Sequence, residues 1–372
     1  MKKLLSILLG ACLIVGCAKK NEDIPIGVYA SLTGSTATFG QSMNRGIEMA
    51  FSEVNDQGGI LGKKMRAVIE DDQSKPEEAK TAVVKLIKRD GVVAVLGEVA
   101  SSRSLAGAPE CQRAGIPMVT PASTNPKVTE MGDYIFRICF IDPFQGEVMA
   151  KFTYETLGVR EAAIFKDIKN DYSVGLASFF EATFKKLGGK IVANESYSEG
   201  DIEFRAQLTA IKSQHPEAIF VPGYYTEVGL IARQIRELGW TGQLLGGDGW
   251  DSPRVVEIGG EAINESYFSN HYAADDPSVV IQKFIETFKA KYGEVPDAMA
   301  VLGYDAAKIL VDAIQRAGSL EGSTIRDALS QTKNYPGISG SITLDKDRNA
   351  RKAAVVLKIE NGKVKFFKRV EP

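Results

Sequence analysis

The run Val92-Val93-Ala94-Val95-Leu96-Gly97 decides the fold class, because it is continuously apolar and rich in β-branched residues. Such a run predicts a strand that is covered on both faces, as the strands of parallel sheets are. Polar residues follow, Glu98-Val99-Ala100-Ser101-Ser102-Arg103, and lead into a helix. The next apolar run, Ile116-Pro117-Met118-Val119-Thr120, has the same character. Strand, helix and strand in this order predict a parallel α/β architecture.

The same alternation continues on both sides of this unit. Before it, strands at residues 24–30 and 65–70 alternate with helices at 40–55 and from Pro76 onward. After it, strands and helices alternate again at residues 162–165, 172–187, 190–197, 204–213, 218–221, 227–238 and 243–246. Each run predicts one doubly wound lobe with right-handed crossovers, so the fold class is α/β with two parallel-sheet lobes.

The last hundred residues predict a different pattern. Three helices are expected at 277–292, 298–317 and 323–330, packed back against one of the lobes. A β-hairpin is expected at residues 353–360 and 363–370, because Asn361-Gly362 between them is a strong two-residue turn signal.

The first twenty-three residues are not expected to belong to the fold. Met1-Lys2-Lys3 is basic, and residues 4–15 form a mostly apolar stretch that is too short to span a bilayer, an order typical of an export signal. Ile14-Val15-Gly16-Cys17 resembles the bacterial lipobox, in which the cysteine becomes the lipidated first residue. We therefore expect a signal peptide at 1–16, a lipid anchor on Cys17 and a tether at 17–23. This protein would be extracytoplasmic and anchored to a bacterial membrane, on the periplasmic side or the outer surface.

Composition excludes several function classes. The 372 residues suggest two domains, and a formal net charge of −2 leaves no basic footprint for nucleic acid. His215 and His271 are the only histidines and lie far apart, so we expect neither a metal nor a cofactor. Cys111 and Cys139 are the cysteines that remain after the signal and the anchor. Two buried free thiols are our preferred interpretation, and one disulfide is the alternative.

Catalytic motifs are missing from the sequence. It contains no Gly-x-Ser-x-Gly elbow, no phosphate loop ending in Gly-Lys-Ser or Gly-Lys-Thr, and no Cys-x-x-Cys. With two scattered histidines and no nucleophile–base context, the sequence favours a non-enzymatic function.

Three strand ends carry polar groups, and ligands of open α/β sheets bind at the carboxyl ends of strands. Ser101 and Ser102 open a helix, Thr124 lies in a loop after a strand, and Asp248 lies in a glycine-rich turn. Helix capping and an Asx turn are the alternative interpretations of these groups. Together they complement a zwitterion, with a carboxylate at Ser101 and Thr124 and an ammonium at Asp248. The expected aromatic wall of this pocket, for which lobe core is the alternative, comprises Phe39, Tyr172, Tyr224 and Trp250.

These residues stand in motifs that resemble the branched-chain amino-acid binding proteins of bacterial ABC importers. The motifs are residues 95–97 with 101–102, 115–124, 246–250, Asp71-Asp72, and Arg137 with 142–146. The resemblance runs from about Ile24 to the hairpin and implies a type I periplasmic-binding fold whose lobes are joined by three crossings. It implies an N-terminal lobe of residues 24–141 and 273–336 and a C-terminal lobe of residues 142–272 and 337–372. The last crossing would fall anywhere between 335 and 352.

The resemblance also implies roles for individual residues. Ser101 and Thr124 would hold the ligand carboxylate, and the carbonyl of Ala122 and the carboxylate of Asp248 would hold the ammonium. Phe39, Tyr172, Tyr224 and Met299 match side-chain wall positions. Ser74 and Ala100 stand where leucine-binding members carry a disulfide, so the wall around Ala100 departs from the family and leaves the exact ligand open.

We therefore expect a monomeric, lipid-anchored solute-binding protein. It would capture an α-amino acid, with an aliphatic or branched-chain one as the preferred ligand, and deliver it to an ABC transporter permease with its ATPase. The alternatives are a sensing module of the same fold, a binder of an amide, urea or aromatic acid, and, least favoured, an enzyme. A simple carboxylic acid would meet like charge at Asp248.

Overall fold

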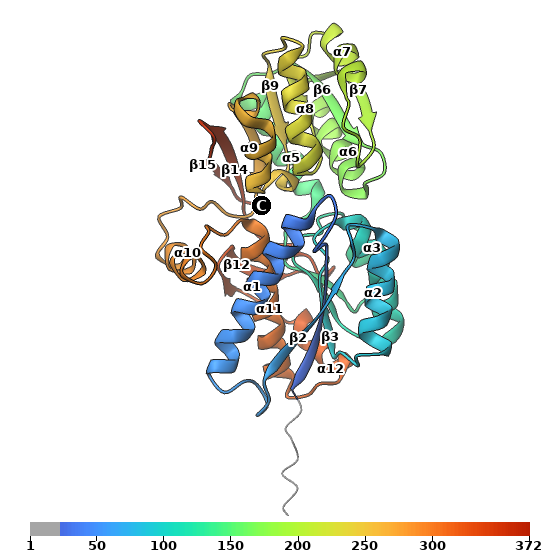
Figure 1. Ribbon diagram of the computed structural model, residues 1–372, viewed down its shortest axis with the longest axis vertical. Helices are drawn as coiled ribbons and strands as arrows, with labels where there is room; N and C mark the ends of the chain where they lie inside the picture. Colours follow the sequence, from blue (N-terminus) through green and yellow to red (C-terminus); the bar gives the residue numbers. More distant parts are fainter. Residues whose placement is uncertain (1–22) are drawn as a thin grey trace, which may run out of the picture.

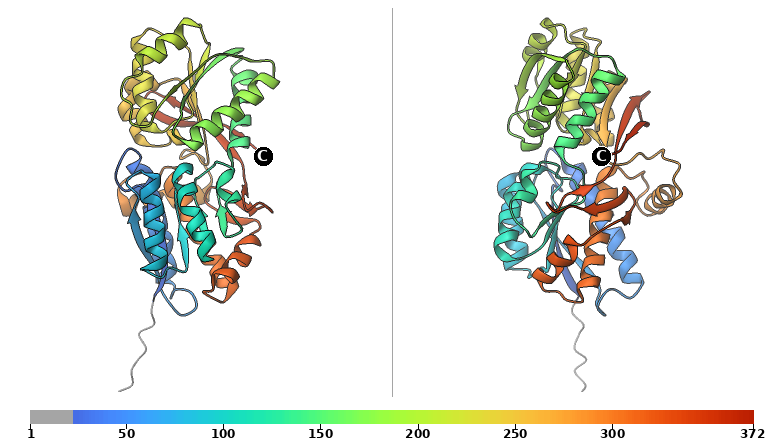
Figure 2. Two further views of the ribbon diagram at one scale, coloured as in Figure 1. Left: turned by 90° about the vertical axis from the view of Figure 1, so that its right-hand side faces the viewer. Right: turned by 180° about the vertical axis from the view of Figure 1, so that it is seen from behind.

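A computed structural model describes residues 23–372 and shows two lobes stacked along the long axis of the molecule (Figure 1). The expected signal peptide, the lipidation site Cys17 and the tether up to residue 22 lie outside the described residues. Each lobe is built on its own sheet, and helices lie on both faces of each sheet (Figure 2). The two-lobed α/β architecture predicted from the alternation of strands and helices is confirmed.

The sheet of the first lobe is entirely parallel, in the order β2-β1-β3-β4-β5. Its strands are β1 (Ile24–Ala30), β2 (Met65–Asp71), β3 (Ala94–Leu96), β4 (Met118–Thr120) and β5 (Ile135–Arg137). The connecting helices are α1 (Ala37–Asp56), α2 (Pro76–Lys88), α3 (Ser101–Ala114) and the short α4 (Lys127–Glu130). Every residue of β3, β4 and β5 is buried, as expected for strands that are covered on both faces.

The late helices return to this first lobe, as expected. They are α10 (Val279–Tyr292), α11 (Ala298–Ala317) and α12 (Gly322–Ser330). α11 packs along α1, and two glycines allow their backbones to approach closely. A side chain at Gly46 would collide with the carbonyl of Ala300, and one at Gly303 would collide with the carbonyl of Met43.

The sheet of the second lobe has the order β15-β14-β10-β9-β8-β6-β7. Its strands are β6 (Glu161–Asp167), β7 (Lys190–Tyr197), β8 (Ala218–Phe220), β9 (Gln243–Gly246), β10 (Ser266–Asn270), β14 (Ala354–Glu360) and β15 (Lys363–Val370). The helices are α5 (Asp142–Lys151), continued by the π-helical turn η1 (Phe152–Thr156), then α6 (Asp171–Lys186), α7 (Arg205–Ser213), α8 (Tyr225–Glu237), α9 (Pro253–Gly259) and the 3-10 turn η3 (Gly260–Ile263). The predicted hairpin is confirmed, since β14 and β15 pair antiparallel across Asn361 and Gly362, both at positive φ.

A small third sheet was not predicted. It consists of β11 (Tyr335–Gly337), β12 (Gly340–Leu344) and β13 (Ala350–Arg351) and packs on the first lobe. The carboxylate of Asp305 on α11 accepts from the backbone N–H groups of Ile338 and Ser339, at 2.8 and 2.9 Å. The guanidinium of Arg348 donates to the carbonyls of Ile135 and Thr129.

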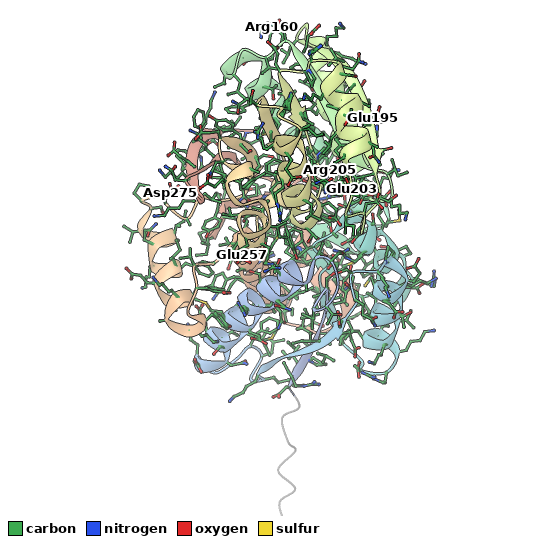
Figure 3. All side chains as sticks on the ribbon, turned by 45° about the horizontal axis from the view of Figure 1, so that its top comes forward. Arg160, Glu195, Glu203, Arg205, Glu257 and Asp275 are labelled. Carbon is green, nitrogen blue, oxygen red and sulfur yellow. The ribbon has the colours of Figure 1, made fainter. Side chains whose placement is uncertain are left out.

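The two cysteines are buried free thiols, which confirms the preferred interpretation over a disulfide. Burial raises the pKa of the Cys139 thiol to about 12, so it stays protonated and inert at neutral pH. Charged side chains cover the outer surface, where Arg205 pairs with Glu203 at 2.7 Å (Figure 3). Within residues 23–372, no helix combines the length and apolarity that crossing a membrane requires.

Candidate functional site

A small cavity lies between the two lobes, where strands of both sheets end. Its lining residues are Phe39, Val99, Ser101, Ala122, Thr124, Tyr172, Tyr224, Asp248, Gly249 and Met299. The structure thus brings together eight of the residues singled out from the sequence, from loops and helices that are up to 260 positions apart in the chain. This convergence follows from the fold, because parallel strands end at one edge of each sheet and the two edges face each other.

The half of the cavity on the first lobe presents hydroxyl groups. Ser101 is the first residue of α3, where a helix N-terminus favours negative charge. Its Oγ accepts from the backbone N–H of Asn125 at 3.2 Å, which fixes the loop after β4 against the helix. Oγ1 of Thr124 is buried and makes no well-formed hydrogen bond to any described residue, although it approaches the carboxyl of Asp142. That hydroxyl is therefore available to a ligand.

The buried Arg137 holds the loop that carries Ala122 and Thr124. Its guanidinium donates to the carbonyls of Ser123 and Pro126, at 2.6 and 3.0 Å. Since Arg137 ends β5, the neighbour of β4, the sheet itself positions the loop. In the sequence, Arg137 was recognised only as part of a motif that resembles the family, and no role was predicted for it.

The half on the second lobe presents a carboxylate. Asp248 begins the 3-10 turn η2 (Asp248–Trp250) directly after β9. Its backbone N–H donates to Oε1 of Gln145 at 3.0 Å, and its Oδ2 lies 3.0 Å from Nε2 of His271. Its other oxygen, Oδ1, is buried and has no hydrogen-bond partner in the described part of the chain. Contacts with Gln145 and His271 therefore hold Asp248 in place, and its carboxylate does not form a local Asx turn.

Sequence reasoning missed Gln145 and His271. Gln145 lay within a quoted motif, and its Oε1 also accepts from the hydroxyl of Ser269 at 2.9 Å. His271 follows β10, a strand that the polar residues Ser266, Ser269 and Asn270 conceal from an apolar pattern search. The only sequence signal for it is the pair Tyr267-Phe268 in the short segment that precedes it.

Buried carboxyl groups are concentrated around this half of the site. Burial raises the pKa of Asp142 to about 8, and the neighbouring charge of Asp248 contributes to this rise. Burial also raises the pKa of Asp251. An anionic group here would add to this repulsion, whereas a cation would relieve it. In residues 23–372 no set of three or more His, Cys, Asp or Glu side chains could hold a metal ion.

Aromatic rings and one thioether wall the cavity. Tyr172 and Tyr224 stack with ring centroids 5.4 Å apart and planes 6° apart, and Phe39 from the first lobe meets the Tyr224 ring edge-on at 5.5 Å. A side chain on Gly249 would come within 2.9 Å of Tyr224, so glycine is required beside these rings. Met299 adds an apolar contact from the first turn of α11.

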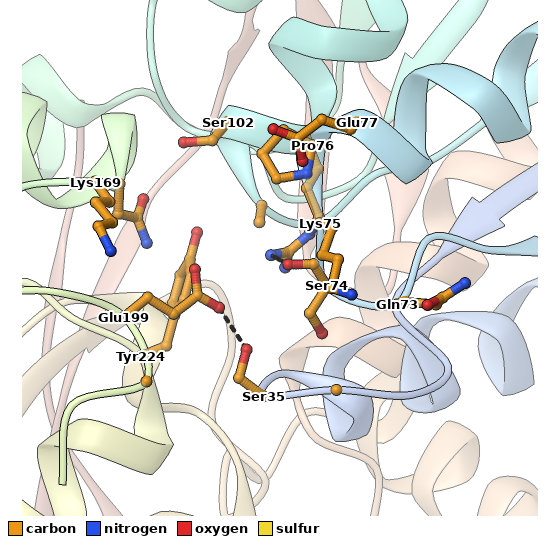
Figure 4. A pocket seen from close by; sticks show the side chains of 15 residues that line it. Ser35, Gln73, Ser74, Lys75, Pro76, Glu77, Ser102, Lys169, Glu199 and Tyr224 are labelled. Carbon is orange, nitrogen blue, oxygen red and sulfur yellow. Dashed lines mark hydrogen bonds between the residues drawn. The ribbon is translucent and has the colours of Figure 1, made fainter.

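Two predicted wall residues lie elsewhere. Trp250 does not line the cavity, which corrects the prediction. It is fully buried in the core of the second lobe, where its indole N–H donates to the carbonyl of Val221 at 2.9 Å. Ala100 lines the adjacent outer cavity, a wider space at the mouth between the lobes (Figure 4).

The lobes are in contact around both cavities. At the mouth, the hydroxyl of Ser35 bonds the carboxylate of Glu199 (Figure 4). Deeper in, Ser102 exchanges two hydrogen bonds of 2.9 Å with Asp171, one to its carboxylate and one from its backbone N–H. In addition, the backbone N–H of Ala298, the first residue of α11, donates to the carboxylate of Asp251 at 2.6 Å. The structure therefore represents a closed form.

Comparisons with known proteins agree with this architecture. A family model described as periplasmic binding protein matches residues 23–363. The Leu/Ile/Val-binding protein BraC3 of Rhizobium johnstonii is 33% identical over 325 residues, which cover 87% of this chain and 88% of that protein.

Two solved structures resemble the whole fold. The leucine binding protein LivK of Thermotoga maritima matches with a TM-score of 0.90 and 43% identity, covering 94% of this chain and 99% of that one. The branched-chain amino acid transporter substrate binding protein LivJ of Streptococcus pneumoniae, solved in complex with isoleucine, matches with a TM-score of 0.90 and 32% identity, covering 94% and 100%. As the sequence motifs predicted, the chain belongs to the periplasmic binding protein family, together with the branched-chain amino-acid binding proteins of ABC importers.

Proposed function

We propose that this protein captures an aliphatic α-amino acid between its lobes and delivers it to the permease of an ABC importer. The observation that carries the proposal is a pair of buried polar atoms without partners among the described residues, Oγ1 of Thr124 and Oδ1 of Asp248. They belong to opposite lobes and line one cavity. Buried polar groups normally have partners, so this pair calls for a ligand that supplies them.

In this proposal the two ends of the ligand bind to different lobes. The carboxylate lies at the N-terminus of α3, with Ser101 and Thr124 as donors, and the ammonium lies between Asp248 and the carbonyl of Ala122. The side chain contacts the rings of Phe39, Tyr172 and Tyr224 and the thioether of Met299. The relatives that bind leucine, isoleucine or valine support an aliphatic side chain.

We further propose that the ligand drives hinge closure. Because each lobe binds one end of the zwitterion, only the closed form satisfies both charges, and closure gives the permease a shape to recognise. The crossings would lie near residues 141–142 and 272–273 and, last, near 352–353. The contacts of residues 338–348 with the first lobe support this late position for the third crossing.

The location in the cell is also a proposal. Family membership supports an extracytoplasmic protein, and the lipobox-like residues 14–17 support a lipid anchor on Cys17. Stable anchoring would require at least two acyl chains. We propose a monomer, with the permease and its ATPase as partners.

Calorimetry on Asp248 variants tests the central proposal. Removing one partner of a buried ion pair costs about 3–5 kcal/mol, so Asp248→Ala should weaken amino-acid binding by roughly 10²–10⁴-fold. Asp248→Asn, which keeps the shape and removes the charge, should lose a similar factor. The exposed Asp347→Asn is the matched control and should bind like the wild type. Wild-type affinity in Asp248→Ala, or a preference for a carboxylic acid without an amino group, would overturn the zwitterion model.

A further inference from the structure

The imidazole of His271 contacts the carboxylate of Asp248, and the sheet register explains why. β9 and β10 are parallel neighbours with Phe268 opposite Gly246, so the residues that follow both strands lie at one edge. Asp248 comes two residues after Gly246, and His271 comes three after Phe268. The side chain of His271 is 0% exposed and that of Asp248 is 4% exposed, so the contact is fully desolvated.

The ring of His271 is fixed in orientation and in tautomer. It stacks on Phe140, with centroids 3.8 Å apart and planes 23° apart. Burial lowers the pKa of the imidazole, although the neighbouring Asp248 opposes the shift, so the ring is neutral at neutral pH. An ionised carboxylate only accepts, so the single proton lies on Nε2 and is donated to Oδ2. Nδ1 has no partner within residues 23–372.

We propose that His271 is a positioning residue of the ammonium site and makes ligand binding depend on pH. This inference rests on the proposed function. By holding Oδ2 of Asp248, the neutral ring turns Oδ1 toward the ligand ammonium. A protonated ring would place a positive charge against the same carboxylate and compete with the ammonium for it. Ligand binding should therefore release a proton from His271 at acidic pH, and the affinity should fall as the pH is lowered.

Other titratable groups contribute to the pH profile of this site. They are Asp142, Asp251, Arg137, Cys139 and Lys352. The charge of Lys352 lowers the pKa of His271, and burial lowers the pKa of Lys352 itself to about 8. The contribution of His271 is thus the part of the profile that disappears when its ring is replaced.

Two substitutions separate positioning from titration. His271→Gln places an amide N–H near the position of Nε2 but cannot be protonated, whereas His271→Met removes the donor. With L-leucine and L-isoleucine as probes in calorimetry, we expect the wild-type affinity to fall between about pH 7.5 and about pH 5.5 by a factor of less than about ten, because the pKa of His271 is lowered from its ordinary value. His271→Gln should stay within about threefold of the wild type at neutral pH and should lose most of this fall. His271→Met should bind about tenfold or more weakly at neutral pH.

The controls make each outcome decisive. His215→Asn replaces the other histidine, which is exposed, and should keep the wild-type profile. In an Asp248→Asn background, His271→Met should cause no further loss. A wild-type profile in His271→Gln, or an undiminished loss in the Asp248→Asn background, would overturn this inference alone. A wild type that binds no amino acid at any pH would overturn the proposed function and this inference with it.

Discussion

The hydroxyl of Thr124 is the counterpart, on the first lobe, of the carboxylate of Asp248. If it donates to a ligand carboxylate, Thr124→Val should weaken binding by about 10–100-fold, because the isosteric valine removes a hydrogen bond to a charged group and little else. Thr124→Ser retains the hydroxyl and should bind within a few-fold of the wild type. Titration calorimetry on this matched pair is the measurement. Equal affinities of the serine and valine variants would show that the hydroxyl does not contact the ligand.

At the scale of single residues, the sequence predicted which residues lie near the cavity. It did not predict the direction in which each side chain points. Asp248 and Thr124 follow strands, and any polar group there lies at the ligand-binding edge. Trp250 follows the same strand as Asp248, β9, but its side chain faces the core of the second lobe. It is the third residue of a 3-10 turn, so its side chain points away from that of Asp248, and its ring packs where a side chain on Gly246 would lie. The direction of a side chain within a turn is set by a conformation that the residue pattern does not reveal.

At the scale of elements, the N-termini of α3 and α6 face each other across the lobes. Ser102 in the first turn of α3 exchanges both of its hydrogen bonds with Asp171, which begins α6. Neither residue lines the small cavity that contains Thr124 and Asp248. Ser102→Ala should therefore weaken ligand binding by about 3–20-fold, because it removes two bonds of the closed form and no ligand contact. The stability of the ligand-free protein should change little.

The measurement for Ser102 combines calorimetry with thermal melts of the ligand-free protein. Ser178→Ala removes a serine hydroxyl from the exposed face of α6, where it bonds its own helix, and is the matched control. Unchanged affinity in Ser102→Ala would mean that the contact between the helices is not part of the ligand-bound form.

Elements with a strong apolar period were predicted to within a few residues, while short polar ones were missed. The bounds predicted for β7, β9 and α11 are those observed. The start of α6 moved by one residue, because Asn170 caps the helix with its side chain and admits Asp171 as its first residue. β10 and the three strands of the small sheet carry too few apolar residues for the sequence pattern to predict them. The pairing of these strands also depends on contacts that the pattern does not show.

At the scale of the whole molecule, the sequence predicted two parallel-sheet lobes but not how they interleave. Local alternation shows that α11 is a helix, but its packing against α1 depends on a contact between residues more than two hundred positions apart. Only the family resemblance supplied the three crossings. The same long-range folding buries carboxyl groups that are unremarkable in the sequence, such as Asp72, Asp142 and Asp305.

These buried carboxyls predict how the stability of the whole molecule depends on pH. Burial raises the pKa of Asp142 from 3.8 to about 8, and it raises that of Asp72 to about 8 and that of Glu227 from 4.5 to about 7. Between the ordinary pKa values of these groups, about 4, and their raised values in the folded protein, the folded state binds more protons than the unfolded state. Stability is therefore greatest below about pH 4 as far as these groups are concerned, and it falls as the pH rises toward about 8. Lys352, whose pKa is lowered from 10.5 to about 8, changes the slope only above that window.

Asp142→Asn isolates one of these groups, because asparagine imitates the protonated carboxyl. The variant should be more stable than the wild type at about pH 8 and should differ little from it at about pH 5, so its stability should fall less steeply with pH. Urea unfolding of the ligand-free proteins across this range measures both curves. Asp347→Asn, at an exposed position, should follow the wild-type curve. An Asp142→Asn curve parallel to that of the wild type would mean that Asp142 is ionised in the folded protein. The negative charge around Asp248 would then be larger than burial alone allows, and the pull of this site on a ligand ammonium would be correspondingly stronger.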